Sequence, residues 1–253
     1  MNIIVCAKQV PARDAALVMA GGWVRESDMS FEMNEPDAFA LEEALRLKEK
    51  HGSEVAALTL GPARAAQVVK EALAKGADRG IHVTDEKSYE LDPLASARIL
   101  AAAVRAEKFD LILTGLQSDD HGFGQTGVLL AALLGLPHAS IIVRIEFRDG
   151  ALRLKRELEG GWFQWLECPL PAVLTIQSGI NKVRYATLKG IMAARSKPVA
   201  TIPRQSLSAD EPTQRMERLY LPRKLKKTEF LSGSPKEAAA KLVEKLKFDA
   251  RVI

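Results

Sequence analysis

The chain has 253 residues, of which 47% are hydrophobic, 27% charged and only 6% aromatic. This length suits one large domain, or one domain with an appendage, and the few aromatic residues favour helices packed on a sheet over a β-sandwich. The stretch from Met1 to Cys6 has no basic leader before an apolar segment, and no run approaches the ~18 apolar residues of a membrane span. We therefore expect a cytoplasmic protein without membrane insertion.

The cysteines and histidines carry little functional signal. Cys6 and Cys168 both lie in apolar, strand-like segments, so we expect two buried free thiols in a reducing compartment rather than a disulfide. The four histidines are scattered without the spacing of metal ligands. The sequence therefore predicts no metal site.

The net charge of +4 is modest but unevenly placed, because residues 169–209 contain no Asp or Glu. The basic residues of this stretch are Lys182, Arg184, Lys189, Arg195, Lys197 and Arg204. No nucleic-acid-binding motif accompanies them, and no aromatic residues are interleaved as stacking platforms, so we predict no nucleic-acid partner. An acidic protein partner and a solvated surface both fit the pattern.

Short, almost wholly apolar segments recur along the first half of the chain. They are residues 2–10, 55–60, 80–83 and 110–116. Such segments are typical of strands that are buried on both faces of a parallel sheet. Between them, apolar residues at helical spacing predict helices over 34–48, 63–75, 92–108 and 124–135. This alternation predicts an α/β fold with a doubly wound, mostly parallel sheet.

The pattern changes after Pro137. Residues 140–158 alternate around Asp149-Gly150, which predicts a β-hairpin extension, and residues 172–176 predict one more strand.

The last part of the chain predicts a long arm. Residues 197–234 are polar and poorly periodic, and an amphipathic helix is expected over 235–247. We assign residues 1–196 to a nucleotide-binding α/β domain and residues 197–253 to a C-terminal arm and helix that wrap a partner subunit. A flexible tail is the alternative.

The usual nucleotide and catalytic motifs are absent from the sequence. The first strand is not followed by Gly-x-Gly-x-x-Gly, and no Walker lysine motif occurs. No Ser-His-Asp or Cys-His set can be assembled, and His121 alone is more often a surface residue than a catalyst.

The most informative segment is the loop 115–127, which follows a buried strand and opens an apolar helix. Open α/β sheets bind ligands at this place, and a helix N-terminus suits a phosphate. Gly124 and Gly127 would let a phosphate approach the backbone, Thr126 would supply a hydroxyl, and Gln125 an amide. A capped helix behind a glycine-rich turn is the alternative for the same residues.

Four segments together resemble the electron-transfer flavoprotein beta family. They are Met33-Asn34 with residues 41–49 (LEEALRLKE), residues 74–80 (AKGADRG), residues 156–161 (RELEGG) running to 170–175 (LPAVLT), and residues 181–188 (NKVRYATL). Each alone is weak, but all four share the family's order and spacing along nearly the whole chain. The residues near Asn181 and those of the tail 218–222 resemble the corresponding residues in the bacterial, AMP-binding branch of this family.

The resemblance implies an adenine-nucleotide-binding, universal-stress-like architecture whose cleft holds AMP, while an alpha subunit carries most of an FAD. AMP would stabilise the folded subunit as a bound ligand and would do no chemistry. By position, the implied AMP pocket consists of Cys6, Asn34, Glu35, Pro36, Asp37, Leu60, Asp120, His121, Gly122, Phe123, Gly124, Gln125, Thr126, Gly127, Val128 and Ala131.

The resemblance also implies partners. Glu157 would pair with an arginine of the alpha subunit, and Arg184, Tyr185 and Leu188 would form a recognition segment with Leu188 as its apolar anchor. Electrons would pass from flavoprotein dehydrogenases, through the FAD, towards a quinone reductase. The chain would then be an electron-carrier subunit and not a stand-alone enzyme.

Departures from the family pattern leave the choice of partner open. Lys182 stands where many members have an acid, and Lys189 follows Leu188 where many have proline. Arg13 falls, by an approximate alignment, at a position that lies near the flavin.

Two alternatives to an AMP-binding beta subunit are also considered. A bifurcating relative would bind a second FAD in this subunit, but its loop tends to read Asp-Gly-Asp followed by Thr-Ala-Gln-Val-Gly, whereas residues 119–127 read DDHGFGQTG, which favours AMP. A free-standing adenine-nucleotide-binding protein of the stress type would be stable alone and would not need the basic arm.

Overall fold

The computed structural model describes residues 1–148, 150–207, 212–222 and 228–253. They form two compact units, Met1–Leu219 and Tyr220–Ile253. The first unit carries the sheet and the cleft described below.

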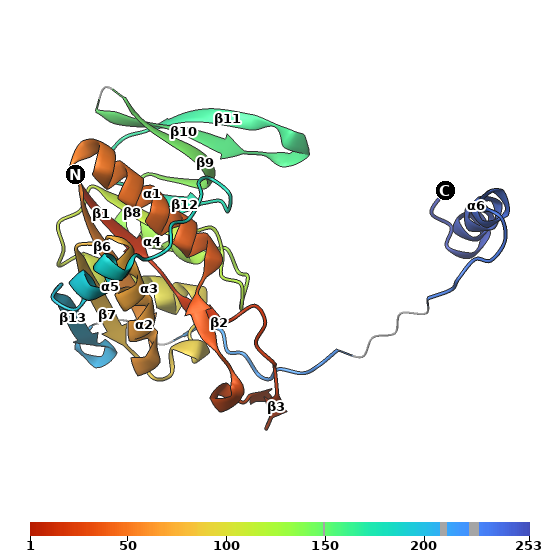
Figure 1. Ribbon diagram of the computed structural model, residues 1–253, viewed down its shortest axis with the longest axis horizontal. Helices are drawn as coiled ribbons and strands as arrows, with labels where there is room; N and C mark the ends of the chain where they lie inside the picture. The colour runs from red at the N-terminus through yellow and green to blue at the C-terminus, as the bar shows by residue number, and fades with distance from the viewer. Residues whose placement is uncertain (149, 208–211, 223–227) are drawn as a thin grey trace. The chain divides into compact units, whose positions relative to one another are not determined.

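A nine-stranded sheet organises the first unit, in the order β11-β10-β9-β12-β8-β1-β6-β7-β13 (Figure 1). Its central strands are β1 (Asn2–Cys6), β6 (Glu54–Gly61), β7 (Arg79–Thr84), β8 (Leu111–Gly115) and β12 (Ala172–Ile176). All neighbouring pairs among them are parallel. Their apolar sequences fit burial on both faces, so the expected parallel core is confirmed.

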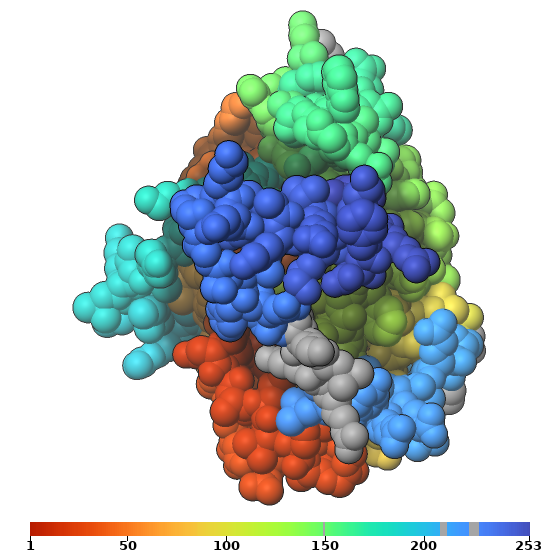
Figure 2. Space-filling model, turned by 90° about the vertical axis from the view of Figure 1, so that its right-hand side faces the viewer, coloured from red at the N-terminus to blue at the C-terminus, as the bar shows by residue number. Residues whose placement is uncertain are grey.

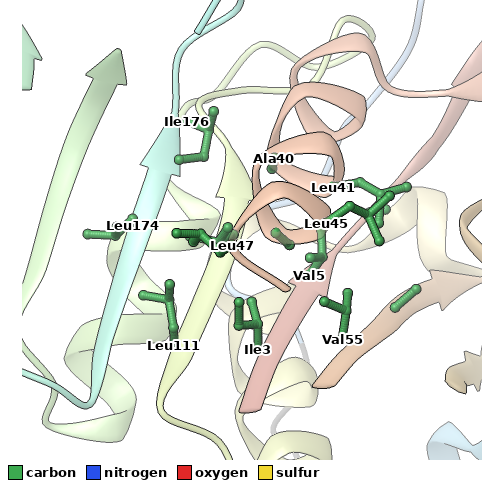
Figure 3. Packing of buried hydrophobic residues seen from close by; sticks show 14 of the residues in the cluster. Ile3, Val5, Ala40, Leu41, Leu45, Leu47, Val55, Leu111, Leu174 and Ile176 are labelled. Carbon is green, nitrogen blue, oxygen red and sulfur yellow. The ribbon is translucent and has the colours of Figure 1, made fainter. Parts of the chain in front are cut away.

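Helices cover both faces of this core, which confirms the doubly wound arrangement. Helices α1 (Glu35–His51) and α2 (Ala66–Lys75) bury one apolar cluster against the sheet, and α3 (Pro93–Val104) and α4 (Thr126–Leu134) bury a second. Figure 3 shows α1 lying over β1, β8 and β12, with Leu41, Leu45 and Leu47 directed at the strands. Chain order reverses between β1 and β8, which makes this point of the sheet a topological switch.

One end of the sheet is antiparallel. Strands β9 (His138–Arg148), β10 (Ala151–Glu157) and β11 (Phe163–Cys168) form a ribbon that continues the sheet beyond β12. The predicted hairpin is thus present, with Gly150 in the left-handed region at φ 81°. Asp149, the other half of its predicted turn, lies outside the described residues.

The other end of the sheet extends past the expected domain boundary. Strand β13 (Val199–Pro203) pairs in parallel with β7, although residues 197–234 read as an arm. The first compact unit consequently runs to Leu219 rather than to residue 196. Prolines at both ends of this strand made it hard to predict from the sequence. An edge strand tolerates proline because the backbone groups on one of its sides form no hydrogen bonds with a neighbouring strand.

Short elements complete the first unit. They are the pairs β2 (Gln9–Pro11) with β5 (Phe31–Met33) and β3 (Met19–Ala20) with β4 (Trp23–Val24), together with helix α5 (Leu188–Ala194) and one-turn helices at 26–28, 63–65, 88–90, 159–161 and 204–206. In the space-filling view the segment around α5, coloured cyan, projects from the surface (Figure 2).

The second unit contains α6 (Pro235–Glu244), followed by a π-helical turn over Lys245–Asp249. Ser234 and Glu237 form a reciprocal capping box, which explains why the helix begins where the sequence predicted. Within this unit the apolar side chains of Leu242, Val243 and Phe248 are exposed.

Among the described residues, no helix combines the length and the apolar character needed to cross a membrane.

Candidate ligand cleft and docking segment

A cleft of about 760 Å³ opens at the carboxyl ends of β1, β6 and β8, where the topological switch lies. This volume falls in the range of small-molecule and cofactor sites. Cys6, Leu60 and Gly115 line it from the three strand ends. Burial raises the pKa of the Cys6 thiol to about 12, so this side chain is an inert apolar wall rather than a nucleophile.

Asp37 fixes the floor of the cleft. Its carboxylate accepts the backbone N–H of Lys8 at 2.8 Å and that of Gly115 at 2.8 Å, so it joins the first turn of α1 to the ends of β1 and β8. Burial raises its pKa to about 6, although these two donors act to lower it. Gly115 leaves room for this arrangement, because a Cβ there would lie 2.5 Å from Asp37 Oδ1.

Asn34 shapes the loop rather than capping α1. Its Nδ2 donates to the carbonyl of Gln117 at 2.9 Å, and its Oδ1 accepts the N–H of Asp119 at 2.9 Å. The residue is almost fully buried, and its side chain makes no cap bond to the helix that it precedes. The N-terminus of α1 is thereby left free of a side-chain cap beside the cleft.

Charged groups meet at the mouth of the cleft. Lys8 Nζ pairs with the Asp120 carboxylate at 2.6 Å, and Asp120 Oδ1 also accepts the N–H of His121 at 2.7 Å. Burial acts to raise the pKa of Asp120, but the charge of Lys8 outweighs it and the pKa is lowered. Burial lowers the pKa of His121, which favours the neutral imidazole, and the ring lies edge-on to Phe123. At the rim, Glu35 pairs with Arg13 at 2.7 Å.

Helix α4 presents its first turn to the cleft. Gln125, Thr126 and Gly127 line the cleft there, and no side chain of the described residues caps this helix start. Gly124 is in the left-handed region at φ 63°. Gly127 has a different role from the one expected, because a Cβ on it would lie 2.6 Å from Thr114 Oγ1. Close packing of α4 on the sheet therefore accounts for this glycine.

Most residues of the expected pocket come together in this cleft. Those that line it are Cys6, Asn34, Asp37, Leu60, Asp120, His121, Phe123, Gly124, Gln125, Thr126 and Gly127. Those outside its lining are Glu35, Pro36, Gly122, Val128 and Ala131. Ala131 is fully buried in the apolar cluster that α3 and α4 form with the sheet.

The opposite wall was not foreseen from the sequence. It includes Trp23, Arg64, Tyr89, Met216 and Leu219. Arg64 is held by Glu26 at 2.8 Å and by Gln9 at 2.9 Å, with its guanidinium 3.9 Å above the Phe31 ring. These residues lie in separate, weakly patterned segments, so no local signal could have joined them.

The predicted recognition residues lie far from the cleft floor, around α5. Tyr185 is 93% exposed and Leu188 is 76% exposed. Thr187 caps α5 by accepting the N–H of Gly190 at 3.0 Å, so Leu188 stands on the first turn of a formed helix. Elsewhere, at the end of β10, Glu157 accepts a hydrogen bond from Gln177 at 3.1 Å.

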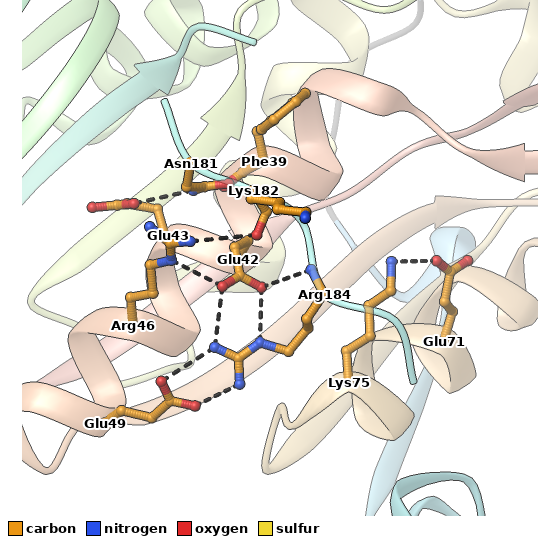
Figure 4. A network of polar contacts seen from close by, with 10 residues as sticks. All are labelled: Phe39, Glu42, Glu43, Arg46, Glu49, Glu71, Lys75, Asn181, Lys182 and Arg184. Carbon is orange, nitrogen blue, oxygen red and sulfur yellow. Dashed lines mark hydrogen bonds and ion pairs between the residues drawn. The ribbon is translucent and has the colours of Figure 1, made fainter. Parts of the chain in front are cut away.

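Arg184 does not project like its neighbour Tyr185 but is engaged within the chain. Its guanidinium pairs with Glu42 at 2.8 Å and with Glu49 at 2.5 Å, and Glu42 also pairs with Arg46 at 2.9 Å (Figure 4). Hydrogen bonds to the two carboxylates raise the pKa of Arg184. This network ties the segment 181–187 to α1, so Arg184 supports the exposed residues next to it.

The fold and the cleft together define a class: a doubly wound α/β protein with a cleft of small-molecule size at the carboxyl edge of its parallel strands. The sequence is matched over residues 22–207 by the family model described as "Electron transfer flavoprotein domain". The electron transfer flavoprotein subunit beta of Methylophilus methylotrophus is 36% identical over 96% of this chain and 97% of its own length. The Bacillus subtilis subunit beta is 33% identical over 100% of both chains, and the human one is 40% identical over 70% of this chain and 71% of its own.

The chain therefore belongs to the electron transfer flavoprotein family and is similar throughout its length to the family's beta subunits. This confirms the resemblance seen in its motifs. These relatives are named as subunits of an electron transfer flavoprotein, in agreement with the expected role as an electron-carrier subunit.

Proposed function

We propose that this chain is the beta subunit of a cytoplasmic heterodimer, holds a structural AMP in the cleft, and shares an FAD carried mainly by an alpha subunit. The FAD supplies the redox chemistry by taking up and releasing electrons. The complex passes electrons from flavoprotein dehydrogenases towards a quinone reductase. The observation that carries the AMP assignment is the cleft itself, where two helix starts without side-chain caps meet at the carboxyl edge of the sheet.

The donors present fit a nucleoside monophosphate. The first turn of α4 offers backbone N–H groups and the positive end of the helix dipole, which suit a phosphate. Thr126 adds a hydroxyl, and Lys8 adds a positive charge at the same mouth. Leu60, Leu58 and Leu100 supply an apolar wall on which a base can lie. These groups bind and exclude water; none is placed to do redox chemistry.

The docking role rests on exposure and charge. Leu188 and Tyr185 present apolar surface on a segment without acidic residues, and a small apolar anchor amid like charges suits a specific but short-lived complex. Glu157, at the end of β10, is proposed to pair with an arginine of the alpha subunit. Arg13, at the cleft rim, is proposed to lie near the flavin.

A count of nucleotides tests the proposal. The chain is co-expressed with its alpha subunit, the complex is denatured, and the released nucleotides are separated and quantified. One AMP and one FAD per heterodimer is the expected result. Two FAD and no AMP would support the bifurcating alternative. A chain that stays monomeric and binds an adenine nucleotide without any flavin-bearing partner would support the stress-type alternative.

A further inference from the structure

Both carboxylate oxygens of Asp92 accept hydrogen bonds, and the donors come from two separate segments of the chain. Oδ1 accepts the N–H of Ala95 at 2.7 Å and so caps the start of α3. Oδ2 accepts the N–H of Thr213 at 2.7 Å, the hydroxyl of Thr213 at 2.9 Å and the N–H of Gln214 at 2.8 Å. One carboxylate thus satisfies four donors, and three of them come from a segment that lies 121 residues or more away.

The helix cap alone does not require an aspartate. Ser, Thr or Asn would accept the same N–H with similar effect, since these residue types cap helices about equally well. What an aspartate adds is a second, charged acceptor, which makes the hydrogen bonds to Thr213 and Gln214 charge-assisted. Asp92 is only 6% exposed; burial acts to raise its pKa, but the donated bonds outweigh this and lower it, so the carboxylate is charged at neutral pH.

The segment that Asp92 holds forms part of the cleft wall. We call residues 212–219 the strap. Met216 and Leu219 of the strap line the cleft, as do Pro93 and Ser96, which follow Asp92 in α3. At its far end the strap is fixed again, because the Leu219 N–H donates to the carbonyl of Gly22 at 2.9 Å.

The strap contains no helix or strand, and its residues Thr213, Gln214 and Arg215 are exposed on the surface. Segments of this kind open locally at low free-energy cost, so each bond to the rest of the fold lowers the open population. Asp92 supplies three such bonds.

We propose that Asp92 is a positioning residue that latches the strap against the cleft, and that this latch sets how long a nucleoside monophosphate stays bound. The inference rests on the proposed function for the identity of the ligand. A nucleotide that leaves only when the strap is open departs at a rate proportional to the open population, so weakening the latch raises the release rate without removing any group from the floor of the cleft.

The variants separate the latch from the cap. Asp92→Ser keeps an acceptor for Ala95 but is too short to reach the strap. Thr213→Val removes one hydroxyl from the strap and leaves α3 untouched, whereas Thr213→Ser keeps that hydroxyl and is the matched control. Each variant is prepared as the complex with the alpha subunit and loaded with tritiated AMP, and the label retained is followed after a chase with excess unlabelled AMP. Hydrogen exchange of residues 213–219 is measured on the same samples.

The expected result is at least a tenfold faster release from Asp92→Ser and about a threefold faster release from Thr213→Val, with Thr213→Ser close to the unmodified chain. Exchange should rise in the strap in the same order, while α3 stays protected. If Asp92→Ser releases AMP at the unmodified rate, or if Thr213→Val and Thr213→Ser behave alike, the latch is overturned while the AMP site stands. If the unmodified complex retains no AMP, the proposed function itself falls, and the inference falls with it.

Discussion

Buried polar groups have different roles in the cleft and in the docking segment, residues 181–194. In the cleft, the side chains of Asn34 and Asp37 form hydrogen bonds with backbone groups of neighbouring loops and strands. The lining of the cleft is therefore fixed within the chain itself. In the segment 181–194, the buried Glu42 instead holds Arg184, and the large apolar side chains of Tyr185 and Leu188 are left to solvent. The first region is complete within the chain, whereas the second supports an exposed apolar surface, which we propose that a partner protein covers.

The largest expected effect comes from removing the support. Glu42 is 3% exposed and receives bonds from both Arg184 and Arg46, so Glu42→Ala leaves two guanidinium groups without their shared partner. We expect a loss of about 3 kcal/mol in the free energy of unfolding, measured by urea denaturation of the complex. Glu49, which is exposed, is the matched control, and Glu49→Gln should cost under about 1 kcal/mol. Equal costs for the two variants would mean that the buried Glu42 holds Arg184 no more firmly than the exposed Glu49 does.

On the cleft side, Gly115→Ala tests whether the floor is fixed. Its Cβ would lie 2.5 Å from Asp37 Oδ1 and 2.6 Å from Pro36 Cβ, so α1 must move. Overpacking of this kind costs about 2 kcal/mol, and we expect that loss together with weaker retention of AMP. Gly52→Asn is the control, because nothing lies within 4 Å of that position and Asn tolerates its left-handed backbone. If Gly115→Ala unfolds at the same urea concentration as the unmodified chain, the cleft floor is able to adapt and is not fixed.

Leu188→Ala tests the docking segment at the surface. The side chain is 76% exposed, so its removal should leave the free energy of unfolding unchanged within about 0.5 kcal/mol. If it anchors a dehydrogenase, the KM of that enzyme for the complex should rise about tenfold with little change in kcat, since an anchor of this size contributes about 1.4 kcal/mol. Lys189→Gln should instead change mainly the dependence of the rate on salt. An unchanged KM for Leu188→Ala would remove this residue from the interface.

The sequence predicts the parallel core and the place of the cleft because both are local patterns. Continuous apolar segments such as 111–115 permit little except a buried strand, and a glycine-rich loop between such a strand and an apolar helix lies at the ligand edge by topology. Helix α5 was missed because Gly190 weakens its helical pattern; that glycine lets α5 pack closely against the backbone of Ala74 in α2.

Contacts between distant segments could not be predicted in this way. Arg64 on the cleft wall and Asp92 under the strap are ordinary charged residues in the sequence. Their roles depend on partners 38 to 122 residues away, which only the folded chain brings together. The same limit applies to Arg184, which motif position grouped with the exposed recognition residues although its own contacts lie within the chain.

The smallest expected effect is a change in pH dependence that comes from Asp37. Its pKa is raised to about 6 in the folded chain from 3.8, so between these values the folded state keeps a proton that the unfolded state has lost. The contribution of Asp37 to the free energy of unfolding therefore falls as pH rises through this window, opposite to the behaviour of Asp120, whose pKa is lowered. In Asp37→Asn this contribution is absent. The stability of the unmodified chain relative to the variant should thus drop by on the order of 1 kcal/mol between pH 4.5 and pH 5.5, measured by urea denaturation at each pH. The opposite result would be a stability difference between the two chains that stays constant or grows between pH 4.5 and pH 5.5. It would show that Asp37 is charged over this whole range, and that the two backbone donors at the cleft floor outweigh the effect of burial on its pKa.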